Sequence, residues 1–148
     1  MICAQAQQEV KNVNFWIFGK RRIRTVKRTP RKQTAEIDEL MKQAKKVIPE
    51  RVAFFAPLVG VRPGRIAIRC QKTRWGSCSA KGNLNFNCLL MLAPPEVMDS
   101  VVVHELCHLK QMNHSKKFYD EVLRIMPDYR TRQKWLKEHG AELLKHAY

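Results

Sequence analysis

Residues 104–108 read His104-Glu105-Leu106-Cys107-His108, in which two histidines stand four positions apart and a glutamate follows the first. On a helix, side chains four positions apart lie about 40° apart around the axis and about 6 Å apart along it, so both imidazoles can reach one metal ion. The glutamate can then act as a general base on a metal-bound water without being a ligand. The flanking apolar residues follow helical spacing and predict that the motif lies within a helix: Val97, Val101, Leu106 and Leu109.

A third histidine, His114, follows the motif. On a continuing helix it would lie about 15 Å beyond His104, out of reach of the same metal. The helix is therefore predicted to end near Met112, with Asn113 in the left-handed conformation that a chain reversal needs. Three nitrogen ligands and a water are typical of an open catalytic zinc site, so the predicted cofactor is Zn²⁺, bound by His104, His108 and His114.

Two alternatives to this ligand set remain open. A downstream carboxylate such as Glu121 could replace His114 as the third ligand, or the three histidines could lie at the surface or at the edge of the core and bind nothing. Zinc sites that serve only the structure have four protein ligands, so a fourth ligand would indicate a structural site.

Positive charge is concentrated near the N-terminus. The chain of 148 residues carries 28 Lys and Arg against 13 Asp and Glu, a formal net charge of +15. Residues 20–32 contain eight cationic side chains and no acidic one, a pattern that favours polyanions and nucleic acid first. The alternative is a solvated surface that keeps the protein soluble. The residues predicted to contact nucleic acid are Arg21, Arg22, Arg24, Lys27 and Arg28.

Several classes of protein are disfavoured by composition. The longest uncharged apolar stretch, Leu89 to Pro95, is far shorter than the ~20 residues that a membrane-spanning helix needs, so no membrane partner is expected. Residues 1–8 lack the features of a secretory signal, and a cytoplasmic protein is expected. The five cysteines are an odd number without a Cys-x-x-Cys pair, which argues against a disulfide framework and against a cysteine-zinc site.

The chain is predicted to form one compact domain, because 148 residues leave little room for a second. Residues 1–33 are expected to form a basic arm with a β-hairpin, and residues 34–148 the rest of the domain. We expect a helix over about 33–48 that Pro49 ends or kinks, a short helix over 50–58, strands over 65–70 and 84–91, and three further helices. This order predicts an α+β fold with a small antiparallel sheet packed beside helices, including the motif helix.

Three linked motifs resemble those of the YgjP-like metallopeptidase domain family, which is related to the WLM and SprT-like (Spartan-type) zincin-fold proteases. They are Thr73-Arg74-Trp75-Gly76-Ser77-Cys78, His104-Glu105-Leu106-Cys107-His108-Leu109, and Asn113-His114-Ser115 with Phe118, and the likeness spans about residues 35–139. It implies that His104, His108 and His114 bind zinc and that Glu105 is the catalytic base. It also implies a minimal zincin-like fold, with the motif helix beneath an edge strand that covers the cleft. Two positions depart from related patterns: Gln111 replaces the metzincin glycine, and Tyr119 stands where the family often has Trp.

The segment Trp75-Gly76-Ser77 is predicted to bind substrate, because an edge strand beside a zincin helix can pair with an extended peptide. The alternative is a structural bend in which Trp75 fills the core and Gly76 permits the backbone conformation.

The favoured function is a zinc-dependent metallopeptidase that hydrolyses peptide bonds through a metal-activated water, with Glu105 as general base. Tyr119 and Tyr129 are candidates for stabilising the transition state by their chemistry alone. The alternative is a basic nucleic-acid-binding module with a structural or vestigial zinc site. The two combine in a protease that its basic arm localises to DNA, where it acts on bound proteins as SprT-like relatives do.

Overall fold

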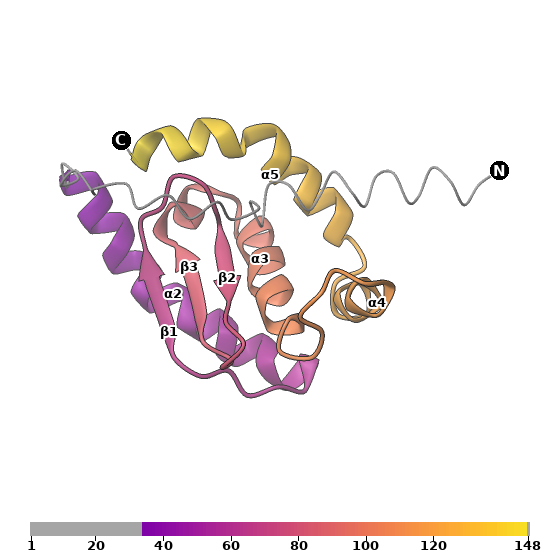
Figure 1. Ribbon diagram of the computed structural model, residues 1–148. Coiled ribbons are helices and arrows are strands. Elements are labelled where there is room, and N and C mark those ends of the chain that lie inside the picture. Colours follow the sequence, from indigo (N-terminus) through magenta and orange to yellow (C-terminus); the bar gives the residue numbers. More distant parts are fainter. Residues whose placement is uncertain (1–33, 148) are drawn as a thin grey trace, which may run out of the picture.

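A computed structural model of the chain describes residues 34–147 (Figure 1). The arm predicted for residues 1–33, with its hairpin and its five nucleic-acid-binding candidates, lies outside the described residues. One long helix precedes three short strands, and three helices follow them. In chain order the elements are α2 (Ala35–Val59), β1 (Ile66–Arg69), β2 (Gly76–Cys78), β3 (Leu84–Asn87), the 3₁₀ helix η1 (Cys88–Leu92), α3 (Pro95–Cys107), α4 (Lys116–Ile125), α5 (Tyr129–Leu144) and the 3₁₀ helix η2 (Lys145–Ala147).

Helix α2 is continuous through Pro49, so the predicted break between two helices is wrong. The hydroxyl of Thr34 caps its first turn by accepting a hydrogen bond from the Ile37 N–H, and Gly60 ends it in the left-handed conformation. A proline inside a helix costs about 3 kcal/mol or more. The apolar stripe nevertheless continues past it, and each large side chain buried there contributes about 1.5–3 kcal/mol, which outweighs that cost. The buried residues beyond Pro49 are Val52, Phe55, Ala56 and Val59.

The three strands form one sheet in the order β1-β3-β2. Strand β3 pairs in parallel with β1, with Ile66 opposite Leu84, and antiparallel with β2, with Gly76 opposite Phe86. The α+β fold class is confirmed, but the sheet is mixed rather than antiparallel. The chain between β1 and β3 contains β2 and is long enough to return to the same end of the sheet, which makes the parallel pairing possible.

Strand β3 is shorter than the predicted strand over 84–91, because Asn87 ends it. The Asn87 side chain accepts hydrogen bonds from the backbone N–H groups of Leu89 and Gln71, and it donates to the carbonyl groups of Gln71 and Arg74. These bonds take the place of the next hydrogen bonds between strands, and they begin η1. The predicted strand over 65–70 is confirmed as β1.

Helix α3 is the centre of the molecule. It contacts α2, α4, α5 and β2, and Figure 1 shows it beside β2, with α5 crossing above the end of the sheet. Ten of its thirteen residues are buried, including His104 and Glu105. The motif therefore lies on a helix that is held on several sides. None of the described helices combines the length and the apolar composition needed to cross a membrane.

Candidate active site

Helix α3 ends at Cys107, and His108 is its C-cap residue, so the prediction that the helix continues to about Met112 is wrong. The N–H groups of Leu109 and Lys110 donate to the carbonyls of Leu106 and Cys107, which tightens the last turn. Among the described residues only Gly60 and Gly82 have positive φ, so the prediction of a left-handed Asn113 is wrong. The earlier helix end leaves residues 109–115 for the reversal, and no single residue has to make it.

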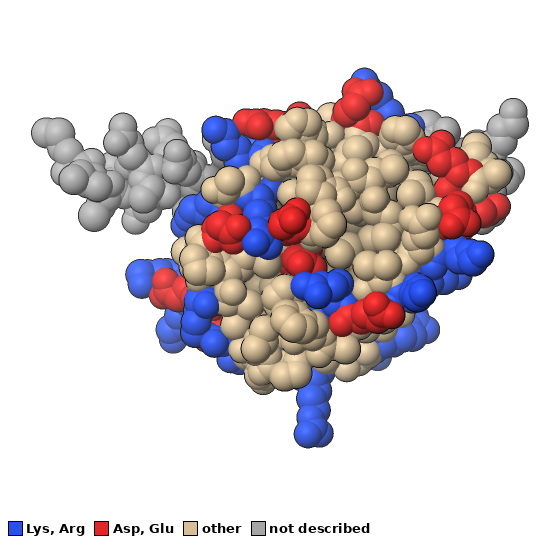
Figure 2. Space-filling model, turned by 180° about the vertical axis from the view of Figure 1, so that it is seen from behind, with Lys and Arg blue, Asp and Glu red and all other residues tan. Residues whose placement is uncertain are grey.

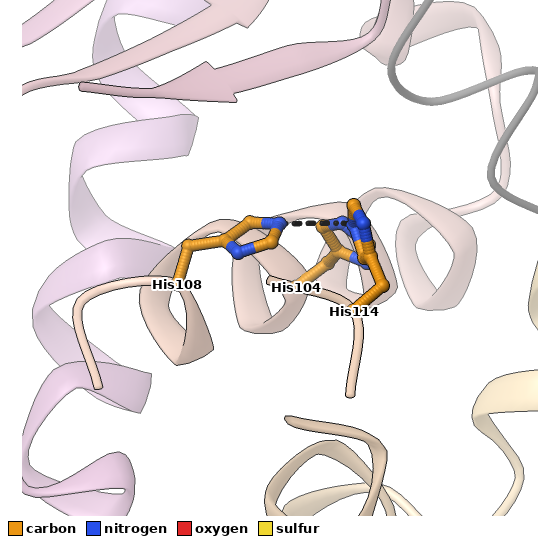
Figure 3. A group of neighbouring side chains, drawn as sticks. All are labelled: His104, His108 and His114. Atoms are coloured by element: carbon orange, nitrogen blue, oxygen red, sulfur yellow. Dashed lines mark hydrogen bonds between the residues drawn. The ribbon is translucent and has the colours of Figure 1, made fainter. Parts of the chain in front are cut away.

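The reversal brings three imidazoles together (Figure 3). His104 Nε2 lies 3.2 Å from His108 Nε2 and 3.3 Å from His114 Nε2. Tetrahedral zinc with Zn–N bonds of about 2.0–2.1 Å places its nitrogen ligands about 3.3–3.4 Å apart. His104 and His108 are buried, with exposures of 1% and 2%, whereas His114 is partly exposed. The two distances from His104 Nε2 match this spacing, and all three ligand nitrogens lie within 4.8 Å of one another, so the three side chains could hold a single metal ion.

Aromatic and backbone groups hold the imidazole rings in place. The ring of Phe118 contacts all three, at centroid distances of 4.8, 4.5 and 5.1 Å from His104, His108 and His114. His108 Nδ1 lies 3.0 Å from the carbonyl oxygen of Gln111. Because a carbonyl only accepts, His108 carries its proton on Nδ1, and its Nε2 lone pair is available to a metal.

Burial lowers the pKa of each of these histidines. Removal from water is the largest cause for all three, and it lowers the pKa of His114 to about 4 and that of His104 well below 6.5. Repulsion between neighbouring imidazoles adds to the effect at His104 and His114. The histidines are therefore neutral at pH 7, which is the form that binds a metal.

Glu105 is fully buried, and neither of its carboxylate oxygens has a hydrogen-bond partner among the described residues. Burial raises its pKa well above 4.5, and Arg74 opposes this rise. A buried carboxylate without partners costs free energy, so its presence needs a functional reason.

The predicted substrate segment covers this glutamate. Gly76 lies so close that a Cβ atom built on it would be 2.8 Å from Glu105 Oε1. Trp75 is buried with 1% exposure and packs against α5, where a Cβ on Gly140 would lie 3.3 Å from its ring, so Trp75 serves the core. Ser77 is half-buried and its hydroxyl accepts a 3.4 Å hydrogen bond from Asn85 Nδ2.

Other candidates lie elsewhere. Glu121 forms ion pairs with Lys110 at 3.4 Å and Arg124 at 2.9 Å, outside the histidine group. Within residues 34–147 no fourth His, Cys, Asp or Glu joins that group. The hydroxyl of Tyr129 contacts His104 Nδ1, on the side of the ring away from the cluster, whereas the ring of Tyr119 lies 6.3 Å from that of His114.

Comparison with known proteins gives the family and similar folds. The family model of the YgjP-like metallopeptidase domain matches residues 3–139. The metallopeptidase zymogen of Pyrococcus abyssi abylysin has a similar fold, with a TM-score of 0.55 and 23% identity over 62% of this chain and 94% of that one. The zymogen of Methanocaldococcus jannaschii jannalysin gives a TM-score of 0.55 and 22% identity over 63% of this chain and 96% of that one. No curated protein matches the sequence.

The fold and the histidine group define the class of protein as a metallopeptidase, a hydrolase that uses a metal cofactor. The chain belongs to the YgjP-like metallopeptidase domain family.

Proposed function

We propose that the protein hydrolyses peptide bonds with zinc bound by His104, His108 and His114, and with Glu105 as the general base. One observation carries this proposal: three imidazole nitrogens within 4.8 Å of one another gather at the end of α3, beside a buried carboxylate that has no hydrogen-bond partner among the described residues. When bound, zinc supplies a Lewis acid that polarises a carbonyl oxygen and lowers the pKa of a water.

Glu105 moves the protons. Its carboxylate takes a proton from the attacking water, and the resulting carboxylic acid gives it to the leaving amine nitrogen. Burial raises the pKa of Glu105 and so favours the protonated form that donates to the leaving amine. Neither oxygen has a hydrogen-bond partner within residues 34–147, so both are available for these transfers.

We propose that the substrate pairs with the outer edge of β2. Asn87 N–H donates to Trp75 O and Ser79 N–H donates to Asn83 O, so residues 75, 77 and 79 direct their backbone groups to β3. By alternation, Gly76 and Cys78 direct theirs to the outer side of β2, where no strand of residues 34–147 pairs. Of the predicted segment Trp75-Gly76-Ser77, only Gly76 remains as a proposed backbone contact with substrate, and Cys78 is added to it.

We also propose that the basic arm binds nucleic acid and brings the peptidase to associated proteins. The support is the run of eight cations in residues 20–32. On the face shown in Figure 2, cationic side chains are mixed with acidic ones, so this face adds no support to the proposal. We propose the cytoplasm as the protein's location, because an odd number of cysteines without a Cys-x-x-Cys pair argues against a disulfide framework.

Metal dependence tests the proposed hydrolysis. The full chain is stripped with a chelator, and cleavage of an unfolded protein substrate is followed by mass spectrometry as Zn²⁺ is added back. We expect activity to return at about one Zn²⁺ per chain, and His108→Ala to regain none. Equal cleavage by the stripped protein, or by His108→Ala, would contradict the proposal.

A further inference from the structure

Tyr129 reaches from α5 to the metal-binding end of α3. It is the first residue of α5, its side chain is 1% exposed, and its hydroxyl oxygen lies 2.6 Å from His104 Nδ1. The two rings are nearly parallel, with an interplanar angle of 20°. This phenol therefore contacts the one nitrogen of His104 that does not face His108 and His114.

We propose that Tyr129 is a positioning residue for the metal site, which holds the His104 ring in the orientation that directs Nε2 toward His108 and His114. When Nε2 binds a metal, the proton of the neutral ring is on Nδ1, and the phenol oxygen accepts a hydrogen bond from it. The inference rests on the proposed metal binding. Tyr129, 25 residues along the chain from His104, would hold the His104 ring in place as the Gln111 carbonyl holds that of His108.

A tyrosine differs from the carbonyl in a way that bears on this role. A carbonyl only accepts, whereas a phenol both donates and accepts. Tyr129 can therefore hold the His104 ring in place in either tautomer, by donating to Nδ1 in one and accepting from Nδ1–H in the other. Metal binding needs only a proton shift between the two ring nitrogens of His104, without a rotation of the buried ring.

The same pair of helices provides a matched control one turn away. Gln133 Nε2 donates a 2.9 Å hydrogen bond to Ser100 Oγ, and both residues are buried. Ser100 precedes His104 by four positions on α3, and Gln133 follows Tyr129 by four on α5. Ser100→Ala removes a buried hydroxyl between α3 and α5, as Tyr129→Phe does, but this hydroxyl bonds to Val97 and Gln133 rather than to a histidine ring nitrogen.

The test measures metal binding by the full chain, in the wild type, Tyr129→Phe and Ser100→Ala. Zn²⁺ affinity is determined by competition with a chelating dye, and the ligand field by the visible absorption of the Co²⁺ forms. Thermal unfolding of each metal-free variant reports any loss that is purely structural.

We expect Tyr129→Phe to bind Zn²⁺ about 10–100-fold more weakly and to change the Co²⁺ spectrum. Ser100→Ala should lower thermal stability while its Zn²⁺ affinity stays within about twofold of the wild type. Wild-type affinity and spectrum in Tyr129→Phe, or an equal loss of affinity in Ser100→Ala, would overturn the positioning role. A wild type that binds no Zn²⁺ would instead overturn the proposed function on which it rests.

Discussion

The backbone of Gly76 lies directly against the carboxylate of Glu105. A Cβ atom on Gly76 would be 2.8 Å from Oε1, 3.0 Å from Cγ and 3.1 Å from Cδ of that side chain. Strand β2, which we propose as the substrate-binding edge, therefore also covers the proposed base, and only glycine leaves room for both.

Replacement of Gly76 by alanine tests this contact. Because Cγ and Cδ are crowded as well as Oε1, the whole Glu105 side chain must shift in Gly76→Ala. We expect peptide hydrolysis to fall at least ~10-fold, since a base misplaced by about 1 Å loses much of its effect. Zn²⁺ affinity should remain unchanged, because no ligand is touched. Full activity of Gly76→Ala would show that the contact is unimportant to catalysis.

The buried carboxylate also predicts a pH-dependent stability in the metal-free protein. The pKa of Glu105 is raised in the folded state, so its contribution to stability is fully present below about pH 4.5 and is lost as pH rises through the folded-state pKa. Metal-free Glu105→Gln should therefore be more stable than the wild type at pH 7. The difference should shrink, by at most about 1.4 kcal/mol per pH unit, as pH falls toward 4.5.

Urea unfolding of the two chains between pH 4.5 and 8 measures this difference. The three histidines are present in both variants, so their own titration largely cancels from the comparison. A difference that stays constant over the whole range would mean that the Glu105 pKa is not raised.

Metal affinity distinguishes His114 from Glu121 as the third ligand. His114→Ala removes one of three nitrogens and should weaken Zn²⁺ binding more than ~100-fold. Glu121→Ala breaks only ion pairs near the surface, worth at most about 1 kcal/mol, and should bind Zn²⁺ as the wild type does. The opposite order of the two affinities would replace His114 by Glu121 in the ligand set.

The basic arm predicts salt-sensitive binding to DNA. Neutralising about six phosphates would lower affinity roughly 10³-fold between 50 and 200 mM salt, without preference for sequence. Exchange of Arg21, Arg22, Arg24 and Arg28 for Gln should flatten this dependence. Fluorescence anisotropy with labelled DNA measures both slopes, and an unchanged slope in the variant would leave the arm without a role in binding.

The sequence predicts best what depends on neighbours along the chain. The histidines at positions 104 and 108 are brought together by helical spacing, and β1 follows from the alternation of Ile66 and Ile68. The helix break predicted at Pro49 is wrong because packing of α2 against the rest of the core outweighs the local cost of the proline. That packing cannot be predicted from the residues around position 49.

Contacts between distant elements are harder to predict from sequence. Tyr129 meets His104 across 25 residues, and the parallel pairing of β1 with β3 depends on a path around β2. One contact between distant elements does leave a signal in the sequence. Gly140 stands inside a helical stretch, where glycine costs about 1 kcal/mol relative to alanine and often marks close packing. The structure accounts for it by the buried ring of Trp75.

The most direct test of the central proposal is the rate of peptide hydrolysis by zinc-loaded Glu105→Gln relative to the zinc-loaded wild type, with the metal content of both samples measured. The amide keeps the size of the side chain but cannot take the proton from water. We predict about one Zn²⁺ per chain in both samples and a rate at least ~10²-fold lower in the variant. A rate close to that of the wild type at equal zinc content would contradict the assignment of Glu105 as the base.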